Sequence, residues 1–188
     1  VMSIGWAASD DGFGWTRQAG EAVSGALLEP SDGQVFIGWP QLLERPQEDC
    51  AILSYHAMQA GRFVICAATS SDELTWAPQG CCFDVSSDPA AFDAGSVSAR
   101  CILPHPSTPE SYVMFYEAQS KDRRHAIGMA TSSDGLQWER ATSRPVFAPA
   151  NGEDSWDSGA VARPWVVALE DGSARMYYLG RSASGAQA

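Results

Sequence analysis

The stretch IGMATSSDGLQW, residues 127–138, decides the fold because the chain uses it three times. It reads as a short β-strand that runs into a tight turn and stops on a tryptophan. IGWAASDDGFGW at 4–15 and ICAATSSDELTW at 65–76 repeat it, so that the closing tryptophans are 61 and then 62 residues apart. A fixed period of this length predicts a repeat architecture.

Two further phrases follow the same period. FDAGSVSARCIL at 92–103 matches WDSGAVARPWVV at 156–167, which places Asp93 and Asp157 in register. A tyrosine also recurs one strand before the turn phrase or its expected place, at Tyr55, Tyr116 and Tyr178. Each unit therefore reads as strand, strand, strand ending in the turn and tryptophan, and then a loop.

The strand runs are short and rich in β-branched and aromatic residues, as in YVMFYEA, RMYYLGR and RFVICAATS. Gly, Asp, Ser or Pro bounds each run, as expected for strands. Residues 20–30 are the one helix candidate, and two glycines with a terminal proline make it weak. The sequence predicts an all-β protein.

The amino-acid composition argues against a membrane span and against a nucleic-acid-binding function. The 188 residues are 45% hydrophobic, which is enough for a real core, and no apolar run approaches the roughly 18 residues of a membrane span. The net charge is −11, from 23 acidic and 12 basic residues. Because nucleic-acid binders carry a basic face, a nucleic-acid partner is not expected.

The cysteines and histidines suggest neither a metal site nor a disulfide framework. The five cysteines have no C-x-x-C spacing, and the three histidines have no metal-ligand spacing among themselves. We expect reduced, mostly buried thiols, which favour a reducing compartment, and we expect no cofactor. Cytoplasm and plastid both fit, and nothing in the residues decides between them.

The repeated turn has a physical explanation. Its aspartate caps the turn by accepting backbone N–H groups, and the following glycine supplies a positive φ. We expect the closing tryptophan to fill the gap between neighbouring sheets. The middle copy has Glu73 in place of glycine, so its turn should be of another type or slightly strained. The capping aspartates are Asp11, Asp72 and Asp134.

A unit of about 60 residues with three or four strands and a closing aromatic is the pattern of a β-propeller blade. DSGAVARPWVV followed by DGSARMYYLGR, and YVMFYEAQSKDRRHAIGMATSSDGLQWER, resemble blades of the five-bladed glycoside hydrolases of the arabinanase, invertase and levansucrase type. The resemblance covers nearly the whole chain. It implies that the first strand of each unit lines a central channel.

The resemblance also implies that the propeller is partial. Repeat units end at Trp15, Trp76 and Trp138, so residues 1–188 hold about three blades of a single domain, whereas five would need roughly 300 residues. Open sheet edges are avoided in folded proteins. We therefore expect missing blades or a protein partner to cover them.

In the family that the chain resembles, carboxylates at the channel mouth split a glycosidic bond, commonly from one or two residues before a proline. One acid must be ionised while another holds a proton. Here Gly38-Trp39, Ser98-Ala99 and Ala162-Arg163 occupy those positions, and none is acidic. Either the acids lie elsewhere or hydrolysis has been lost.

Three acids remain catalytic candidates. Asp93 and Asp157 should lie on loops that lead into the innermost strands, where they could act as turn formers or as catalysts. Glu117 has His56 and Leu179 at the equivalent positions, so the blade does not require an acid there. It is a candidate catalyst, and the alternative is a surface or ion-paired glutamate.

Two arginines and two tryptophans on the channel strands are candidates for substrate binding. A guanidinium can grip sugar hydroxyls or an anionic group, and the alternative is a buried ion pair with the aspartates. Tryptophan can stack on a sugar, and the alternative is core packing. By contrast, we expect His125 to lie on a solvated hairpin. The four candidates are Arg100, Arg163, Trp39 and Trp165.

Two hypotheses follow from the sequence. The first is a glycosidase or transglycosidase that uses Glu117 with Asp93 or Asp157. The second is a non-catalytic propeller that binds a carbohydrate or a protein partner within a larger assembly. Fold-level resemblance favours the first hypothesis, and the missing channel acids favour the second.

Overall fold

The computed structural model describes residues 1–31, 33–45, 50–152 and 155–183. Within these ranges every regular element is a β-strand, which confirms the all-β prediction, and residues 20–30 form turns and bends. In the described part of the chain no helix is long and apolar enough to cross a membrane. All five cysteines are free thiols. The chain divides into two compact units, Val1–Cys81 and Cys82–Ala188.

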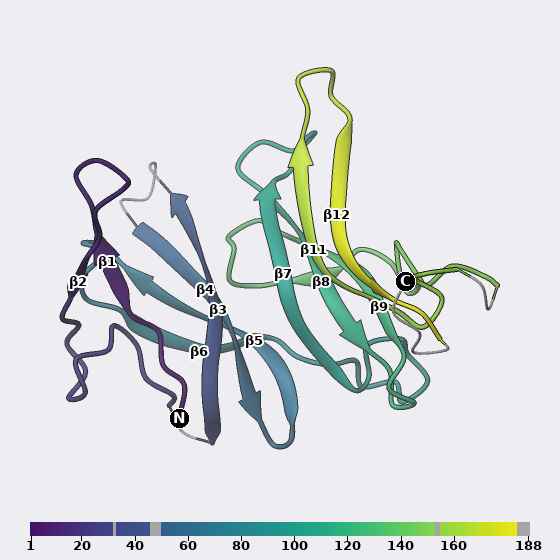
Figure 1. Ribbon diagram of the computed structural model, residues 1–188, viewed down its shortest axis with the longest axis horizontal. Helices are drawn as coiled ribbons and strands as arrows, with labels where there is room; N and C mark the ends of the chain where they lie inside the picture. Colours follow the sequence, from purple (N-terminus) through teal and green to yellow (C-terminus); the bar gives the residue numbers. More distant parts are fainter. Residues whose placement is uncertain (32, 46–49, 153–154, 184–188) are drawn as a thin grey trace. The chain divides into compact units, whose positions relative to one another are not determined.

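The first unit holds a hairpin, β1-β2, and an antiparallel sheet in the order β3-β4-β5-β6 (Figure 1). An isolated bridge joins Ile4 to Leu28, and both pack with Ile37, Tyr55 and Val64 in the buried core of this unit. The bounds are β1 Trp6–Ala8, β2 Thr16–Gln18, β3 Gln34–Arg45, β4 Cys50–Gln59, β5 Arg62–Ser70 and β6 Ala77–Phe83.

The second unit holds an antiparallel sheet in the order β7-β8-β9-β10 and the β11-β12 hairpin (Figure 1). The bounds are β7 Ser96–Pro104, β8 Tyr112–Gln119, β9 His125–Ser132, β10 Glu139–Arg140, β11 Ala160–Ala168 and β12 Ala174–Arg181. Strand β11 packs on β7, β8 and β9, where the Val166 N–H lies 3.4 Å from the Cys101 sulfur. Met114, Ile127 and Val161 are fully buried in this core.

The other face of the β11-β12 hairpin is apolar and exposed. At the equivalent position in β7, Cys101 is 1% exposed because β11 covers it, whereas Trp165 in β11 is 60% exposed. This exposed apolar face consists of Trp165, Val167, Tyr177 and Leu179.

The repeated turn folds in the same way in all three copies. A serine Oγ accepts the N–H of the residue after the aspartate at 2.8 or 2.9 Å. The aspartate Oδ1 accepts the next two N–H groups at 2.7–2.9 Å, and the tryptophan Nε1 donates to a turn carbonyl at 3.1 or 3.2 Å. The N–H of Thr75, and then that of Leu74, lower the pKa of Asp72 to about 2, because they stabilise its ionised form.

The middle copy keeps this hydrogen bonding with a strained residue. Glu73 has a φ of 58°, close to the 77° of Gly12 and the 75° of Gly135. The turn type is therefore unchanged, and Glu73 is strained. The left-handed conformation costs a residue with a Cβ about 1–2 kcal/mol. The gap-filling role expected of the tryptophans is not general, since Trp76 packs against the core of the first unit while Trp15 is 65% exposed.

Candidate functional site

The first strand of each of the three sequence repeats is interrupted at the same place. The pairing register shifts between Gly38 and Gln41 in β3, between Val97 and Arg100 in β7, and between Ala162 and Trp165 in β11. Such bulges bend a strand and turn a side chain out of the sheet, and they often occur beside functional sites.

Two of these bulges hold a left-handed residue immediately before a proline. Trp39 has a φ of 52° and precedes Pro40, and Arg163 has a φ of 51° and precedes Pro164. Proline lacks the N–H that a regular sheet would use, and a bulge tolerates that loss. Strained backbone of this kind persists only where the surroundings hold it, and it is often found at binding sites.

Glu117 lies directly opposite the β7 bulge. Its neighbours on β8 pair with residues on either side of Ser98 and Ala99, and Glu117 itself pairs with Ile127 of β9. Its Oε2 accepts the backbone N–H of Arg163 at 3.3 Å. The carboxylate thus connects the β8-β9 hairpin to the bulge of β11.

The second oxygen of Glu117 binds His125. The distance from Nδ1 to Oε1 is 2.8 Å, and the exposed fractions are 26% for the His125 side chain and 14% for that of Glu117. The other ring nitrogen of His125 lies 2.7 Å from the Gln119 side-chain nitrogen. With that amide nitrogen as donor, the ring accepts at Nε2 and donates from Nδ1 to the Glu117 carboxylate.

His125 was wrongly expected on a solvated hairpin. It begins β9, pairs with Gln119 and lies diagonally across the hairpin from Glu117. Diagonal neighbours on adjacent strands are within reach of long side chains. The near-symmetric placement of residues 117 and 125 around the turn was the signal in the sequence that could have identified this pair.

Asp93 is buried at the start of the β7 sheet, with 1% exposure. Its Oδ2 accepts the Tyr116 hydroxyl at 3.0 Å and Arg140 Nε at 2.6 Å. The cation beside Asp93 is therefore Arg140, and not the Arg100 considered from the sequence. Burial, followed by the negative charge of Asp93, raises the pKa of Tyr116.

Asp157 occupies the equivalent place before β11. Its carboxylate accepts the Ser155 hydroxyl at 2.7 Å and the Tyr178 hydroxyl at 2.9 Å. These two bonds, that of Ser155 first, hold the pKa of Asp157 below its ordinary value. Neither Arg163 nor any other arginine in the described ranges pairs with this aspartate.

The remaining candidates lie on the strands where they were expected. Arg100 is buried in β7 opposite Tyr116, with 7% exposure. Trp165 projects from β11 on the exposed apolar face. In the first unit Trp39 is 49% exposed at its bulge, and its ring centroid lies 5.1 Å from that of His56, the counterpart of Glu117. The structure thus joins Glu117 to Arg163 and keeps Asp93 and Asp157 in hydrogen-bonded clusters of their own.

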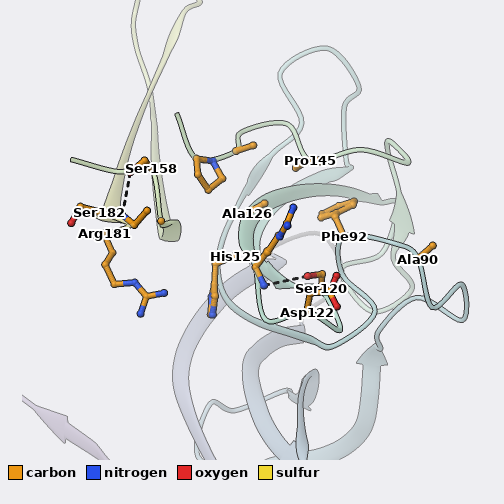
Figure 2. Close-up of a pocket in the computed structure, with 15 residues that line it drawn as sticks. Ala90, Phe92, Ser120, Asp122, His125, Ala126, Pro145, Ser158, Arg181 and Ser182 are labelled. Carbon is orange, nitrogen blue, oxygen red and sulfur yellow. Dashed lines mark hydrogen bonds between the residues drawn. The ribbon is translucent and has the colours of Figure 1, made fainter. Parts of the chain in front are cut away.

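His125 also borders a cavity of about 880 Å³ in the second unit (Figure 2). The cavity lies where β8 ends and β9 begins, beside the start of β11 and the end of β12. Among the described residues, no group of three or more His, Cys, Asp or Glu side chains is arranged to hold a metal ion. The available chemistry is that of the His125 imidazole and two arginines, which line the cavity, and of the Glu117 carboxylate, which contacts His125.

Comparison with solved structures identifies the fold. A glycosyl hydrolase from Bacteroides ovatus matches 96% of this chain with a TM-score of 0.69 and 17% identity, and 52% of that protein is covered. A putative glycosidase from Bacteroides thetaiotaomicron matches 96% of this chain with a TM-score of 0.67 and 18% identity, and 53% of it is covered. Neither protein-family models nor the sequences of curated proteins match this chain.

A third match is the β-1,2-mannobiose phosphorylase of Listeria innocua, with a TM-score of 0.63 and 19% identity. It covers 95% of this chain and 45% of that protein. The chain thus has the fold of the five-bladed β-propeller glycoside hydrolases and spans about half of their length, which confirms the prediction of a partial propeller. At these identities the likeness concerns the fold alone.

Proposed function

We propose that this protein binds a carbohydrate at the bulges of β7 and β11 in the second unit, with Glu117 as the carboxylate that contacts the sugar. The supporting observation is the fixed position of Glu117, which His125 holds at one oxygen and the Arg163 N–H at the other. An ionised carboxylate accepts about four hydrogen bonds, so two remain for sugar hydroxyls. Sites whose side chains are held in place bind with a smaller entropic cost.

Two further residues support a sugar-binding role at the bulges. The side chain of Arg163 is exposed beside Glu117, where it can donate to sugar hydroxyls. In the first unit, taken by itself, Trp39 offers a half-exposed ring on which a sugar can stack at the β3 bulge. Trp165 lies on the exposed apolar face with Tyr177, which favours its packing alternative.

Hydrolysis is the second candidate function, and the contact between Glu117 and His125 favours it because such a pair can hold or move a proton. Glycoside hydrolysis needs two carboxyl groups about 5–10 Å apart. The partner would be Asp93, Asp157 or an acid outside this chain. The burial of Asp93 and the hydrogen bonds of both aspartates support binding without hydrolysis.

The proposal includes the assembly predicted from the sequence. Residues 1–188 would form one part of a single propeller, and further blades or a protein partner would cover the exposed apolar face. The equivalent face of the β7-β8 pair is covered by β11 in this chain, which supports a blade-like covering.

Substitution Glu117→Gln tests the proposal. Binding of the full chain to a glycan array, followed by calorimetry on the best neutral sugar, should show an affinity loss of about 10-fold or more, as for a lost charged hydrogen bond. Glu170→Gln is the matched control, because Glu170 is exposed beyond the end of β11, away from the bulges.

The result also separates the two functions. Loss of sugar affinity in Glu117→Gln supports binding through this carboxylate. Retained affinity with loss of glycoside turnover supports hydrolysis. If sugar affinity and turnover both match those of the unmodified chain, Glu117 does not serve the site and the proposal fails.

A further inference from the structure

The cavity beside His125 carries positive charge in an acidic protein. Arg124 and Arg181 line it together with His125, and Asp122 is the one carboxylate among the lining residues that the structure describes (Figure 2). Acidic residues outnumber basic ones by 23 to 12 in the whole chain, so a hollow with this balance is unusual for the molecule. We call this hollow the arginine cavity.

The two guanidinium groups remain available for a ligand. Within the described ranges neither Arg124 nor Arg181 forms a side-chain hydrogen bond or an ion pair, and both are exposed. In Figure 2 the Arg181 side chain extends towards the side of the hollow where His125 lies. A guanidinium binds a carboxylate or a phosphate through two parallel hydrogen bonds, which makes arginine well suited to anions.

The rest of the lining suits a sugar ring. Phe92, Pro145 and Pro149 contribute apolar surface, and serines also line the cavity. Ser120 Oγ accepts the Arg124 N–H at 3.2 Å and Ser158 Oγ accepts the Ala183 N–H at 3.1 Å, so each hydroxyl retains its own proton to donate. Ligand sites commonly combine apolar walls with a few placed polar groups in a hollow of 300–1,000 Å³.

A second cavity lies next to the arginine cavity. It has a volume of about 590 Å³, shares the lining residues Ala90, Phe92 and Pro145 with the arginine cavity, and extends along residues 141–144.

We propose that the arginine cavity binds an anionic sugar, whose charged group is held by Arg124 and Arg181 while its ring lies against Phe92 and Pro145. The inference rests on the proposed function and gives its substrate class. The shared chemistry is a monosaccharide unit with a carboxylate or a phosphate group. His125 connects the two sites, because its ring lines the cavity while its Nδ1 contacts Glu117.

The test compares glucose, glucuronate and glucose 6-phosphate as ligands of the full chain by calorimetry. We expect at least one of the anionic sugars to bind about 10-fold more tightly than glucose, since an arginine–anion pair contributes about 1.5–3 kcal/mol. Raising the salt concentration from about 0.05 to 0.5 M should reduce that preference, because exposed charges are screened.

Substitutions locate the effect. Arg181→Ala and Arg124→Ala should each remove most of the preference for the anionic sugar over glucose. Arg175→Ala is the matched control, because Arg175 is an exposed arginine of the same strand, β12, outside the cavity lining. An equal loss in Arg175→Ala would show a general charge effect and overturn the inference.

The remaining outcomes separate this inference from the proposed function. Tight binding of glucuronate alone identifies the charged group as a carboxylate, and tight binding of glucose 6-phosphate alone identifies it as a phosphate; both support the inference. Equal affinities for the three ligands overturn it and leave the proposed function intact. An anion preference that persists in Glu117→Gln, with no glycan affinity lost there, supports the cavity and contradicts the role of Glu117.

Discussion

The Asp93–Tyr116 pair and the Asp157–Tyr178 pair occupy equivalent places in the two sheets of the second unit, yet their charges are balanced differently. Each tyrosine donates its hydroxyl to the aspartate that precedes the first strand. Each tyrosine ring also meets one aromatic ring edge-on and another stacked. The edge-on partners are Phe83 and Phe147 at 4.8 and 4.7 Å, and the stacked partners are Phe92 and Trp156 at 6.4 and 5.6 Å.

The difference lies in the second partner of the aspartate. Asp93 is paired with Arg140, which comes from the fourth strand, β10, and lies over the Phe83 ring at 4.5 Å. Asp157 has Ser155, a neighbour on its own loop. The β11-β12 sheet has two strands in the described residues, so nothing there takes the place of β10. The repeated motif thus gives both tyrosines the same kind of aromatic contacts. The presence of β10 determines whether an arginine pairs with the aspartate.

The largest test of this comparison is Asp93→Ala against Asp157→Ala. Removing Asp93 leaves the buried Tyr116 hydroxyl and the Arg140 Nε without their shared acceptor, while Arg140 keeps its bond to the Asp84 carbonyl, so we expect a loss of about 3 kcal/mol in the free energy of unfolding. Asp157→Ala should cost less, because no cation depends on it. Urea denaturation of the full chain measures both, and equal losses would contradict the role given to Arg140.

A smaller loss of stability is expected when alanine replaces a glycine that packs against an aromatic ring of these two clusters. A Cβ at Gly128 would overlap the Tyr116 ring, which is fully buried and cannot move away. Gly128→Ala should therefore cost about 2 kcal/mol through overpacking. A Cβ at Gly180 would meet the ring of Trp156, which is 56% exposed and has room to rotate, and the Cβ of Asp157, so one of its two contacts can be relieved. Gly180→Ala should be milder and should change tryptophan fluorescence; a larger loss there than in Gly128→Ala would contradict this explanation.

The smallest expected effect concerns acid sensitivity. The depressed pKa of Asp157 contributes stability that is present above its unfolded pKa, near 3.8, and is lost as the pH falls through the folded value. Ser155→Ala removes the larger of the two causes, so the pKa should rise towards 3.8 and the acid-dependent part of the stability should become smaller. Carboxyl NMR titration measures the shift. Ala91, at the equivalent position in the Asp93 cluster, shows that the fold tolerates alanine there.

Much of the fold could be predicted from the sequence, because the period fixes what repeats. The repeated turn sequence predicted which aspartates cap the turns. The matching register of residues 93 and 157 predicted that they lie on equivalent loops. The absence of acids at the positions of the bulges could also be seen in the sequence, since it depends only on residue identity. That these strands bulge, with positive φ at Trp39 and Arg163, is visible only in the structure.

The site was less predictable because its contacts join residues that the fold brings together and that have no regular spacing in the sequence. Arg140 reaches Asp93 across 47 residues through β10, a strand of two residues that no periodic pattern marks. His125 appeared as part of a charged turn, KDRRH, although its pairing with Gln119 directs it toward Glu117. Charge runs look alike in sequence whether they face solvent or a neighbouring strand.

The chain-order arrangement of strands within each sheet has a consequence for how the protein folds. Strands β7, β8 and β9 each pair with the strand that comes next in the chain. Most pairings therefore close short loops, which lowers the contact order and favours rapid folding for an all-β protein. Hairpins of this kind form in about 1–10 μs. Each sheet can assemble as its own residues become available, so the order of synthesis is also an order of assembly.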